Sequence, residues 1–197
     1  MRIGILVDGQ GEYYAFPHLL PRIASPNTIL GPYFSPIQPF ASPAQIAHVA
    51  SKRFGTLPDV DLILLLIDKE TRQECTGPFV QEIEREARKR SGGVEVRGVL
   101  KVTKLENWLI ADPQALRSLP GLFGNVERIE KQVPQGRADA ADAHELLKTC
   151  SRKRGYDKKA GAIEICKKLD PERARQNSRS FRKLLKTLGC LERQAPR

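Results

Sequence analysis

The sequence predicts an α/β protein whose mostly parallel sheet is flanked by helices. In the first hundred of its 197 residues, apolar stretches rich in β-branched side chains alternate with helical patterns. This alternation is typical of parallel strands joined by crossover helices. The strongest stretch, residues 60–67, is apolar without alternation, which indicates a strand buried on both faces. The length favours one domain with at most a small appendage.

Local signals place the strands and helices along the chain. Strands are predicted over residues 2–8, 60–67 and 94–102. Helices are predicted over residues 12–23, 43–54, 78–90, 105–111, 114–119, 141–149, 157–169 and 178–188. Pro17 predicts a kink or a late start in the first helix, and Ser42 and Ser178 are suitable N-caps for two others. The proline-rich residues 25–42 predict an extended loop with at most one short strand, and residues 133–140 a polar loop.

The charge divides the chain into two parts. The net charge of +10 comes from 33 Lys and Arg against 23 Asp and Glu, and residues 101–197 hold the whole excess. We expect an α/β core over residues 1–112 and a helical basic region over residues 113–197 packed on it. The basic region favours a polyanionic partner, nucleic acid before an anionic membrane. The candidate nucleic-acid contacts are Arg152, Lys153, Arg154, Lys158, Lys159, Arg179, Arg182 and Lys183. The alternative is a solvated basic face.

Several other classes of protein are excluded by the composition. No apolar run approaches the roughly 18 residues of a membrane span, and no signal-peptide pattern opens the sequence. The four cysteines lack the spacing of a zinc site or a disulfide framework, so we expect a cytoplasmic protein with reduced thiols. Gly9-x-Gly11 lacks the third glycine of a dinucleotide-binding loop. Trp108 is expected in the core.

Acidic side chains follow the predicted strands at the points where these end. Asp8 closes the first strand and Glu12 lies one turn later; Asp68 and Glu70 close the central strand; Glu106 follows the third. Ligands of open α/β sheets bind outside the carboxyl ends of the strands. Carboxylates gathered there repel one another without a cation, and oxygen ligands suit Mg²⁺ or Mn²⁺. The alternative is that these acids are turn formers and helix caps.

Four motifs resemble one family when taken in order. LVDGQGE, LLLIDKE, KLENWLIADP and GYDKKAGAIEICKKLD, followed by NSRSFRKLL, resemble the bacterial and archaeal domain-of-unknown-function family 4276. The resemblance covers residues 1–189, and its two later motifs are the specific ones. The family is similar to Toprim domains, the α/β catalytic fold of topoisomerases, primases and overcoming-lysogenization-defect nucleases. Its members look like components of antiphage defence loci.

The resemblance implies a metal site and its ligands. Toprim chemistry implies a Glu after the first strand and a D-x-D after a later one, which bind Mg²⁺ for cleavage or transfer at a phosphodiester. Here these positions fall on Asp8, Asp68 and Glu70, so Asp replaces the first Glu and Glu replaces the second Asp. These three residues are expected to hold Mg²⁺ or Mn²⁺. Glu12 or Glu106 is expected to orient or deprotonate the attacking water.

The expected function is a Toprim-like, metal-dependent nuclease or phosphodiester-transfer protein that acts on DNA or RNA, in antiphage defence. Asp8 in place of Glu keeps a second hypothesis open, a non-catalytic nucleic-acid-binding or regulatory module that works with a partner ATPase. A third hypothesis is a scaffold whose basic region docks an acidic protein.

Overall fold

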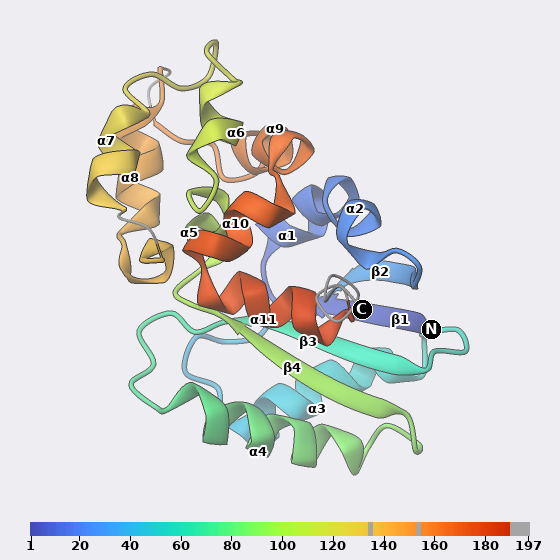
Figure 1. Cartoon of the computed structure of the whole chain (residues 1–197). Helices are drawn as coiled ribbons and strands as arrows, with labels where there is room; N and C mark the ends of the chain where they lie inside the picture. Colours follow the sequence, from blue (N-terminus) through green and yellow to red (C-terminus); the bar gives the residue numbers. More distant parts are fainter. Residues whose placement is uncertain (134–135, 153–154, 190–197) are drawn as a thin grey trace, which may run out of the picture.

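Four parallel strands form a single sheet at the centre of the molecule (Figure 1). The structure is a computed structural model that describes residues 1–133, 136–152 and 155–189. The strands are β1 (Arg2–Val7), β2 (Thr28–Phe34), β3 (Leu62–Asp68) and β4 (Glu95–Lys101), in the order β2-β1-β3-β4. The predicted α/β class with a parallel sheet flanked by helices is confirmed.

Helices cover both faces of the sheet. In Figure 1, α3 (Pro43–Phe54) and α4 (Thr76–Arg88) lie below it and the remaining helices lie above it. Six of the seven residues of β3 are buried, as the unbroken apolar run predicts. Helix α3 begins at the predicted N-cap, because Ser42 Oγ accepts from the Gln45 N–H and the Gln45 side chain accepts from the Ser42 N–H.

The proline-rich part of the chain differs most from the prediction. The single helix expected over residues 12–23 is instead α1 (Gln10–Ala15), the 3₁₀ turn η1 (Phe16–His18) and α2 (Leu20–Ala24). Pro17 and Pro21 each stand at the start of a new segment, since proline cannot donate the backbone hydrogen bond of a helix interior. The loop, for which at most one short strand was expected, contains one strand of seven residues, β2, an edge strand that includes Pro32.

The rest of the chain is helical within the described residues. Its elements are α5 (Leu105–Leu109), α6 (Pro113–Arg117), α7 (Glu127–Gln132), η2 (Ala138–Ala140), α8 (Ala143–Cys150), α9 (Ala160–Lys168), α10 (Pro171–Asn177) and α11 (Arg179–Thr187). Helices α7 and α10 are absent from the prediction. Each is one or two turns long, too short for a recognisable apolar period. None of the described helices has the length and apolar character needed to cross a membrane.

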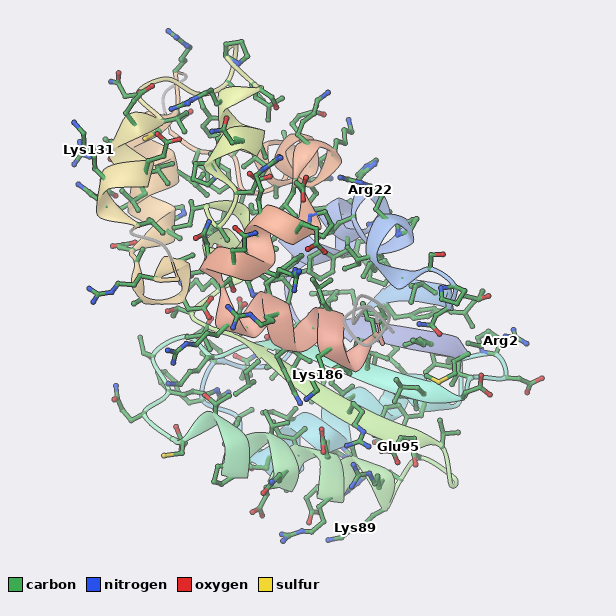
Figure 2. The ribbon with its side chains drawn as sticks, in the orientation of Figure 1. Arg2, Arg22, Lys89, Glu95, Lys131 and Lys186 are labelled. Atoms are coloured by element: carbon green, nitrogen blue, oxygen red, sulfur yellow. The ribbon has the colours of Figure 1, made fainter. Side chains whose placement is uncertain are left out.

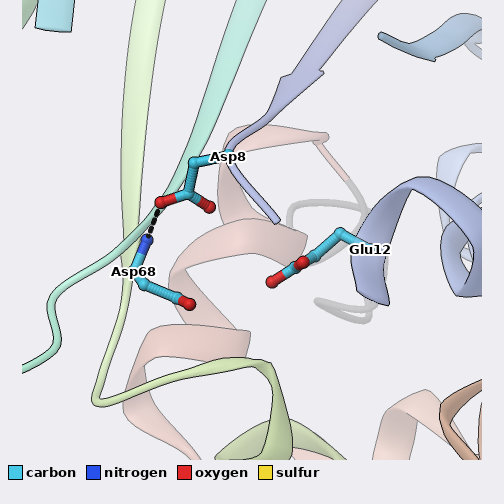
Figure 3. A group of neighbouring side chains, drawn as sticks. All are labelled: Asp8, Glu12 and Asp68. Carbon is cyan, nitrogen blue, oxygen red and sulfur yellow. Dashed lines mark hydrogen bonds between the residues drawn. The ribbon is translucent and has the colours of Figure 1, made fainter. Parts of the chain in front are cut away.

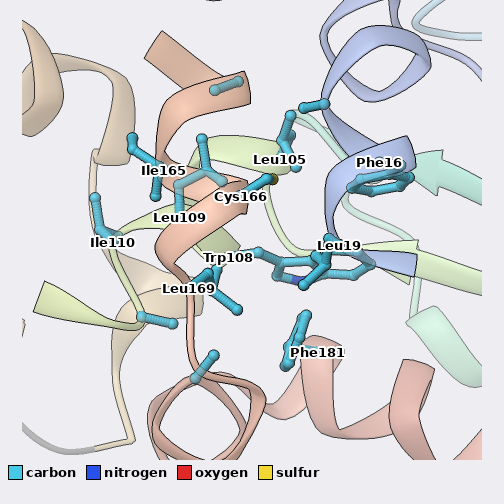
Figure 4. Close-up of a cluster of buried hydrophobic side chains, with 14 of the residues drawn as sticks. Phe16, Leu19, Leu105, Trp108, Leu109, Ile110, Ile165, Cys166, Leu169 and Phe181 are labelled. Atoms are coloured by element: carbon cyan, nitrogen blue, oxygen red, sulfur yellow. The ribbon is translucent and has the colours of Figure 1, made fainter. Parts of the chain in front are cut away.

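The upper helices and the sheet share one hydrophobic core (Figure 4). This cluster contains side chains of β1, β3 and β4 and extends to Leu188 after α11. Trp108 is fully buried in it, stacked on Phe16 at 6.1 Å between ring centroids and edge-on to Phe181 at 5.4 Å. The prediction of a core tryptophan is therefore confirmed. The core also crosses the predicted boundary at residue 112.

A buried polar network fixes α11 to α5. Ser180 Oγ accepts from Trp108 Nε1–H at 2.7 Å and lies 3.0 Å from Asp139 Oδ1. Asp139 also accepts from Ser178 Oγ and from the Ser180 N–H, at 2.6 Å and 2.9 Å. Ser178 Oγ accepts from the Phe181 N–H as the predicted N-cap of this helix. The two most specific sequence motifs, KLENW and NSRSF, thus meet in one structural contact.

Candidate metal centre

Three carboxylates converge at the carboxyl end of the sheet (Figure 3). Asp8 directly follows β1, Asp68 is the last residue of β3, and Glu12 lies in the first turn of α1. Each offers an oxygen within 4.8 Å of the others. The parallel topology explains the meeting, because adjacent strands running in one direction end at one edge.

Lys101 lies among the three carboxylates. It is the last residue of β4, and the register of β3 and β4 pairs it with Asp68. Its Nζ lies 2.5 Å from Glu12 Oε1, 2.8 Å from Asp8 Oδ1 and 3.1 Å from Asp68 Oδ1. The Lys101 side chain has no exposed surface. A buried ammonium requires such partners, since burying an unpaired charge is costly.

The backbone holds the acids close together. The Asp68 N–H donates to Asp8 Oδ2 at 2.8 Å, which fixes the first carboxylate against the end of β3. Gly9 makes room for the Glu12 carboxylate, since a Cβ at position 9 would overlap Glu12 Oε2. The Asp8-Gly9 pair therefore does more than turn the chain. Its glycine allows the acid of α1 to approach the acid of β1.

Burial and charge act in opposite directions on these groups. Burial raises the pKa of Asp68 well above its usual value, and the neighbouring Asp8 and Glu12 raise it further against the attraction of Lys101. Burial alone would lower the pKa of Lys101, but the three carboxylates together raise it well above its usual value. The ammonium is therefore held protonated.

The donor set fits a divalent cation. Three carboxylates and one ammonium leave two negative charges when all are ionised, which a single divalent ion would balance. Asp68 Oδ1 is buried and has no hydrogen-bond partner among the described residues, although Lys101 lies at ion-pair distance. Hard oxygen ligands of this kind are those that Mg²⁺ and Mn²⁺ take. The competing structural interpretation is that Lys101 is the permanent counter-ion of the acids.

Two predicted site residues lie outside this group. Glu70 follows the end of β3, and its φ of 50° turns the backbone, so the strand geometry that would align it with Asp68 does not persist. Its N–H donates to the Thr103 carbonyl. Glu106, in the first turn of α5, is buried, and its Oε1 lies 3.9 Å from His144 Nδ1. Asp8, Glu12 and Asp68 therefore lie together, whereas Glu70 and Glu106 lie outside their group.

The candidate nucleic-acid residues are dispersed. Arg152 Nε donates to the Pro120 carbonyl, and Lys153 and Arg154 lie outside the described residues. Lys158 is exposed, and Lys159 Nζ lies 3.5 Å from the centroid of the Tyr14 ring.

The three candidate residues of α11 are exposed but serve different surfaces. Arg179 and Lys183 line a groove beside β4. Arg182 Nε instead donates to the Arg175 carbonyl. Figure 2 shows basic side chains on many parts of the surface, including Arg22, Lys131 and Lys186.

Lys101 is the member of the site that the sequence reasoning missed. A lysine after an apolar strand, as in GVLK, is most often a solvated residue that marks the strand end. Its burial depends on acids from two segments that are distant from it in sequence, one with Asp8 and Glu12 and one with Asp68. The aligned ends of β3 and β4 were the available signal, because they place Asp68 and Lys101 side by side.

One family model matches almost the whole chain. The model described as a domain of unknown function (DUF4276) matches residues 7–189. The chain belongs to the DUF4276 family. The matched region contains Asp8, Glu12, Asp68 and Lys101 as well as α11. No curated protein and no solved structure matches the chain. Membership in DUF4276 therefore confirms the resemblance and leaves the activity to be inferred from the site.

Proposed function

We propose that this DUF4276 protein is a Toprim-like, divalent-metal-dependent nuclease or phosphodiester-transfer protein that acts on DNA or RNA. The observation that carries the proposal is the convergence of Asp8, Glu12 and Asp68 at the carboxyl end of the sheet. The net charge of +10 supports a nucleic-acid substrate, because positive charge attracts phosphates without regard to sequence. The resemblance suggests a place in antiphage defence.

Asp8, Glu12 and Asp68 would hold the metal ion, Mg²⁺ or Mn²⁺. Such an ion, when bound, supplies a Lewis acid for the phosphoryl oxygen and an acidic water as nucleophile. The chain supplies the placement: the Asp68 N–H fixes Asp8, and Lys101 Nζ donates to both Asp8 and Glu12. The Lys101 ammonium also adds a fixed positive charge where a phosphate would gain negative charge.

Glu106 and His144 are the further candidates for proton transfer. Their contact joins a buried carboxylate to a half-exposed imidazole at 3.9 Å. Glutamate and histidine side chains both serve as general acids or bases, and a contact at this distance is electrostatic, not a hydrogen bond. We assign this pair to moving a proton and the three convergent acids to holding the metal.

The test compares acids inside and outside the group. Wild type, Asp68→Asn and the control Glu70→Gln are assayed for Mn²⁺ binding by calorimetry and for cleavage of plasmid, single-stranded DNA and RNA with Mg²⁺ or Mn²⁺. Losing one charged ligand should weaken Mn²⁺ binding by about tenfold or more, equivalent to about 1.4 kcal/mol. It should also abolish cleavage. Glu70→Gln should match wild type.

Two results would overturn the proposal. One is equal cleavage by wild type and Asp68→Asn. The other is a folded wild type that neither binds Mn²⁺ nor cleaves any of these substrates.

One observation favours a second candidate function. Lys101 already provides a cation among the three carboxylates, so the site is partly neutralised by the chain itself. This arrangement suits a non-catalytic nucleic-acid-binding or regulatory module that works with a partner ATPase. Nucleic-acid binding that is equal in wild type and Asp68→Asn, without Mn²⁺ binding or turnover, would favour it.

A further inference from the structure

A groove of about 850 Å³ runs along the outer edge of β4. One wall is the N-terminal half of α4, and the other consists of η2 and the first turns of α11. Its floor follows β4 and the residue after it and includes the apolar Val99, Leu100 and Val102, whereas Val80 belongs to the α4 wall. Figure 1 shows β4 as the front strand, with α4 below it and α11 above it. None of the site residues described above as metal ligands lines this groove.

The rim of the groove is positively charged. Four basic residues line it, namely Arg97, Arg137, Arg179 and Lys183, of which Arg97 pairs with Glu95 at 2.8 Å. The two acids that line it are already engaged. Glu84 accepts from the Gly98 N–H and pairs with Arg88, and Asp139 accepts from Ser178 and Ser180. The available charge therefore attracts an anion.

Two of the four basic residues of α11 line the groove. Arg179 and Lys183 are four positions apart and so lie on one face of the helix. Arg182 lies off this face, with its Nε held by the Arg175 carbonyl. Of the three nucleic-acid contacts predicted in this helix, Arg179 and Lys183 therefore line the groove. Arg182 instead joins α11 to α10.

The edge of β4 is poorly suited to pairing with a peptide strand. Side chains already occupy its backbone groups: Glu84 accepts from the Gly98 N–H at 2.8 Å, and Arg88 donates to the Val96 carbonyl at 3.1 Å. The Val102 N–H donates to Ser180 Oγ at 3.4 Å. An added strand would need these same groups. The groove therefore favours an occupant held by charge and apolar contact.

The groove adjoins the candidate metal centre. Leu100 and Val102 both line it, and Lys101 between them extends to the three carboxylates. A molecule bound in the groove would therefore contact Leu100 and Val102, the two neighbours of Lys101 in the sequence. This juxtaposition links a binding surface to the proposed chemistry.

We propose that the groove along β4 binds a single strand of nucleic acid, with its phosphates on Arg137, Arg179 and Lys183 and its bases over the apolar floor. Unpaired bases offer apolar faces to such a floor, whereas a duplex keeps its bases stacked inside and offers mainly phosphates. The inference deepens the proposed function by naming its substrate class, and it rests on that function for the role of the acids.

The first test places a negative charge in the groove without removing any contact. A Cβ at Gly77, which lines the groove at the start of α4, would meet nothing within 4 Å. An acid in the first turn of a helix is favourable, so Gly77→Glu should leave the thermal midpoint unchanged or higher. Gly55→Glu is the matched control, because position 55 is equally open and ends α3.

Binding is measured by fluorescence anisotropy in EDTA, so that no cleavage interferes. The probe is a labelled single strand of about 16 nucleotides, within the range that one small domain contacts. We expect Gly77→Glu to raise the Kd about tenfold and Gly55→Glu to leave it unchanged. Arg179→Ala with Lys183→Ala should lower the slope of log K against log salt by about 1.4, the value for two phosphate contacts on a single strand.

Three results would overturn the inference. The first is an equal effect, or none, of Gly77→Glu and Gly55→Glu. The second is a duplex of the same length that binds as tightly and is weakened by the same variants. The third is competition by polyglutamate at equal charge concentration, which would assign the groove to an acidic protein segment.

The outcome is separable from that of the proposed function. If the groove variants lose binding while the wild type cleaves nothing, the groove assignment stands and the hydrolytic proposal fails. If the wild type cleaves single strands and Gly77→Glu cleaves them with an unchanged KM, the hydrolytic proposal stands and the groove assignment fails.

Discussion

Lys101 shows how one residue can make an acidic cluster compatible with folding. Three carboxylates within 4.8 Å of one another would repel strongly in a partly buried site. The ammonium meets all three and loses its own hydration in return. The acids and the lysine therefore depend on each other, and neither side of the arrangement would be stable alone.

Removing the Lys101 charge should destabilise the fold strongly. Lys101→Met leaves the buried acids without their counter-ion, and breaking a buried ion pair on one side costs about 3–5 kcal/mol. Urea unfolding followed by circular dichroism measures the loss. Adding Asp68→Asn to the same chain removes part of the uncompensated charge and should recover part of the stability. A Lys101→Met variant as stable as wild type would contradict this account.

The same residue should shape stability at alkaline pH. The pKa of Lys101 is raised above its unfolded value of about 10.5, so the folded state holds this proton more tightly than the unfolded state. Its contribution is therefore complete below that pH and is lost as the pH rises through the folded pKa. The difference in unfolding free energy between wild type and Lys101→Met should stay constant from pH 8 to about 10 and shrink above it. A difference that grows there would contradict the sign.

At the scale of single residues, the sequence predicts the acids of the site. It does not predict the lysine that balances their charge. Asp8, Glu12 and Asp68 follow from where two strands end and where the next helix begins. The prediction that Glu70 is a metal ligand fails because the backbone turns at this residue, where φ is 50°. A single sequence carries no signal for that turn. Lys101 was not predicted because the acids around it come from two segments that are distant from it in sequence.

Helix α11 is attached to the rest of the protein by polar atoms as well as by its apolar face. Ser180 is the centre of this attachment, since it accepts from Trp108 and contacts Asp139. The helix also supplies three residues of the groove, Arg179, Ser180 and Lys183, so its docking sets the width of that groove. Its attachment therefore bears on the proposed strand-binding surface as well as on stability.

Ser180→Ala should cost about 1–3 kcal/mol, because it leaves the fully buried Trp108 N–H without an acceptor. Urea unfolding measures the change. Ser118→Ala is the control: its hydroxyl donates only to the Ala115 carbonyl one turn away, and its loss should cost less than about 0.5 kcal/mol. Equal costs in the two variants would show that the Trp108 contact is not what stabilises the helix.

The elements that the sequence predicts well are those with long, clear patterns. Helix α3 has a clear N-cap and β3 has a long apolar run, and the structure contains both elements where they were predicted. Helix α10 consists of seven residues that begin at Pro171, and its N-cap Asp170 followed by proline was the signal that could have revealed it. The broken helix over residues 12–23 shows that two prolines can divide a pattern whose apolar spacing looks continuous.

The whole chain should unfold as one unit. The main hydrophobic cluster joins β1, β3 and β4 to the helices that follow residue 112, so neither part can keep its core without the other. Fluorescence of Trp108, the single tryptophan, reports on the centre of this cluster, and circular dichroism reports on all the helices. The two urea transitions should coincide. Separate midpoints would instead support independent units on either side of residue 112.

The two edges of the sheet have a consequence for how the protein behaves when it is concentrated. A row of free backbone groups at an edge invites another chain to add a strand, which is how ordered aggregates grow. Here β2 carries Pro32, which has no N–H to offer, and β4 has its backbone groups occupied by Glu84 and Arg88. Neither edge is therefore well suited to pair with a strand from another molecule, and we expect the folded protein to resist fibril formation through its sheet edges.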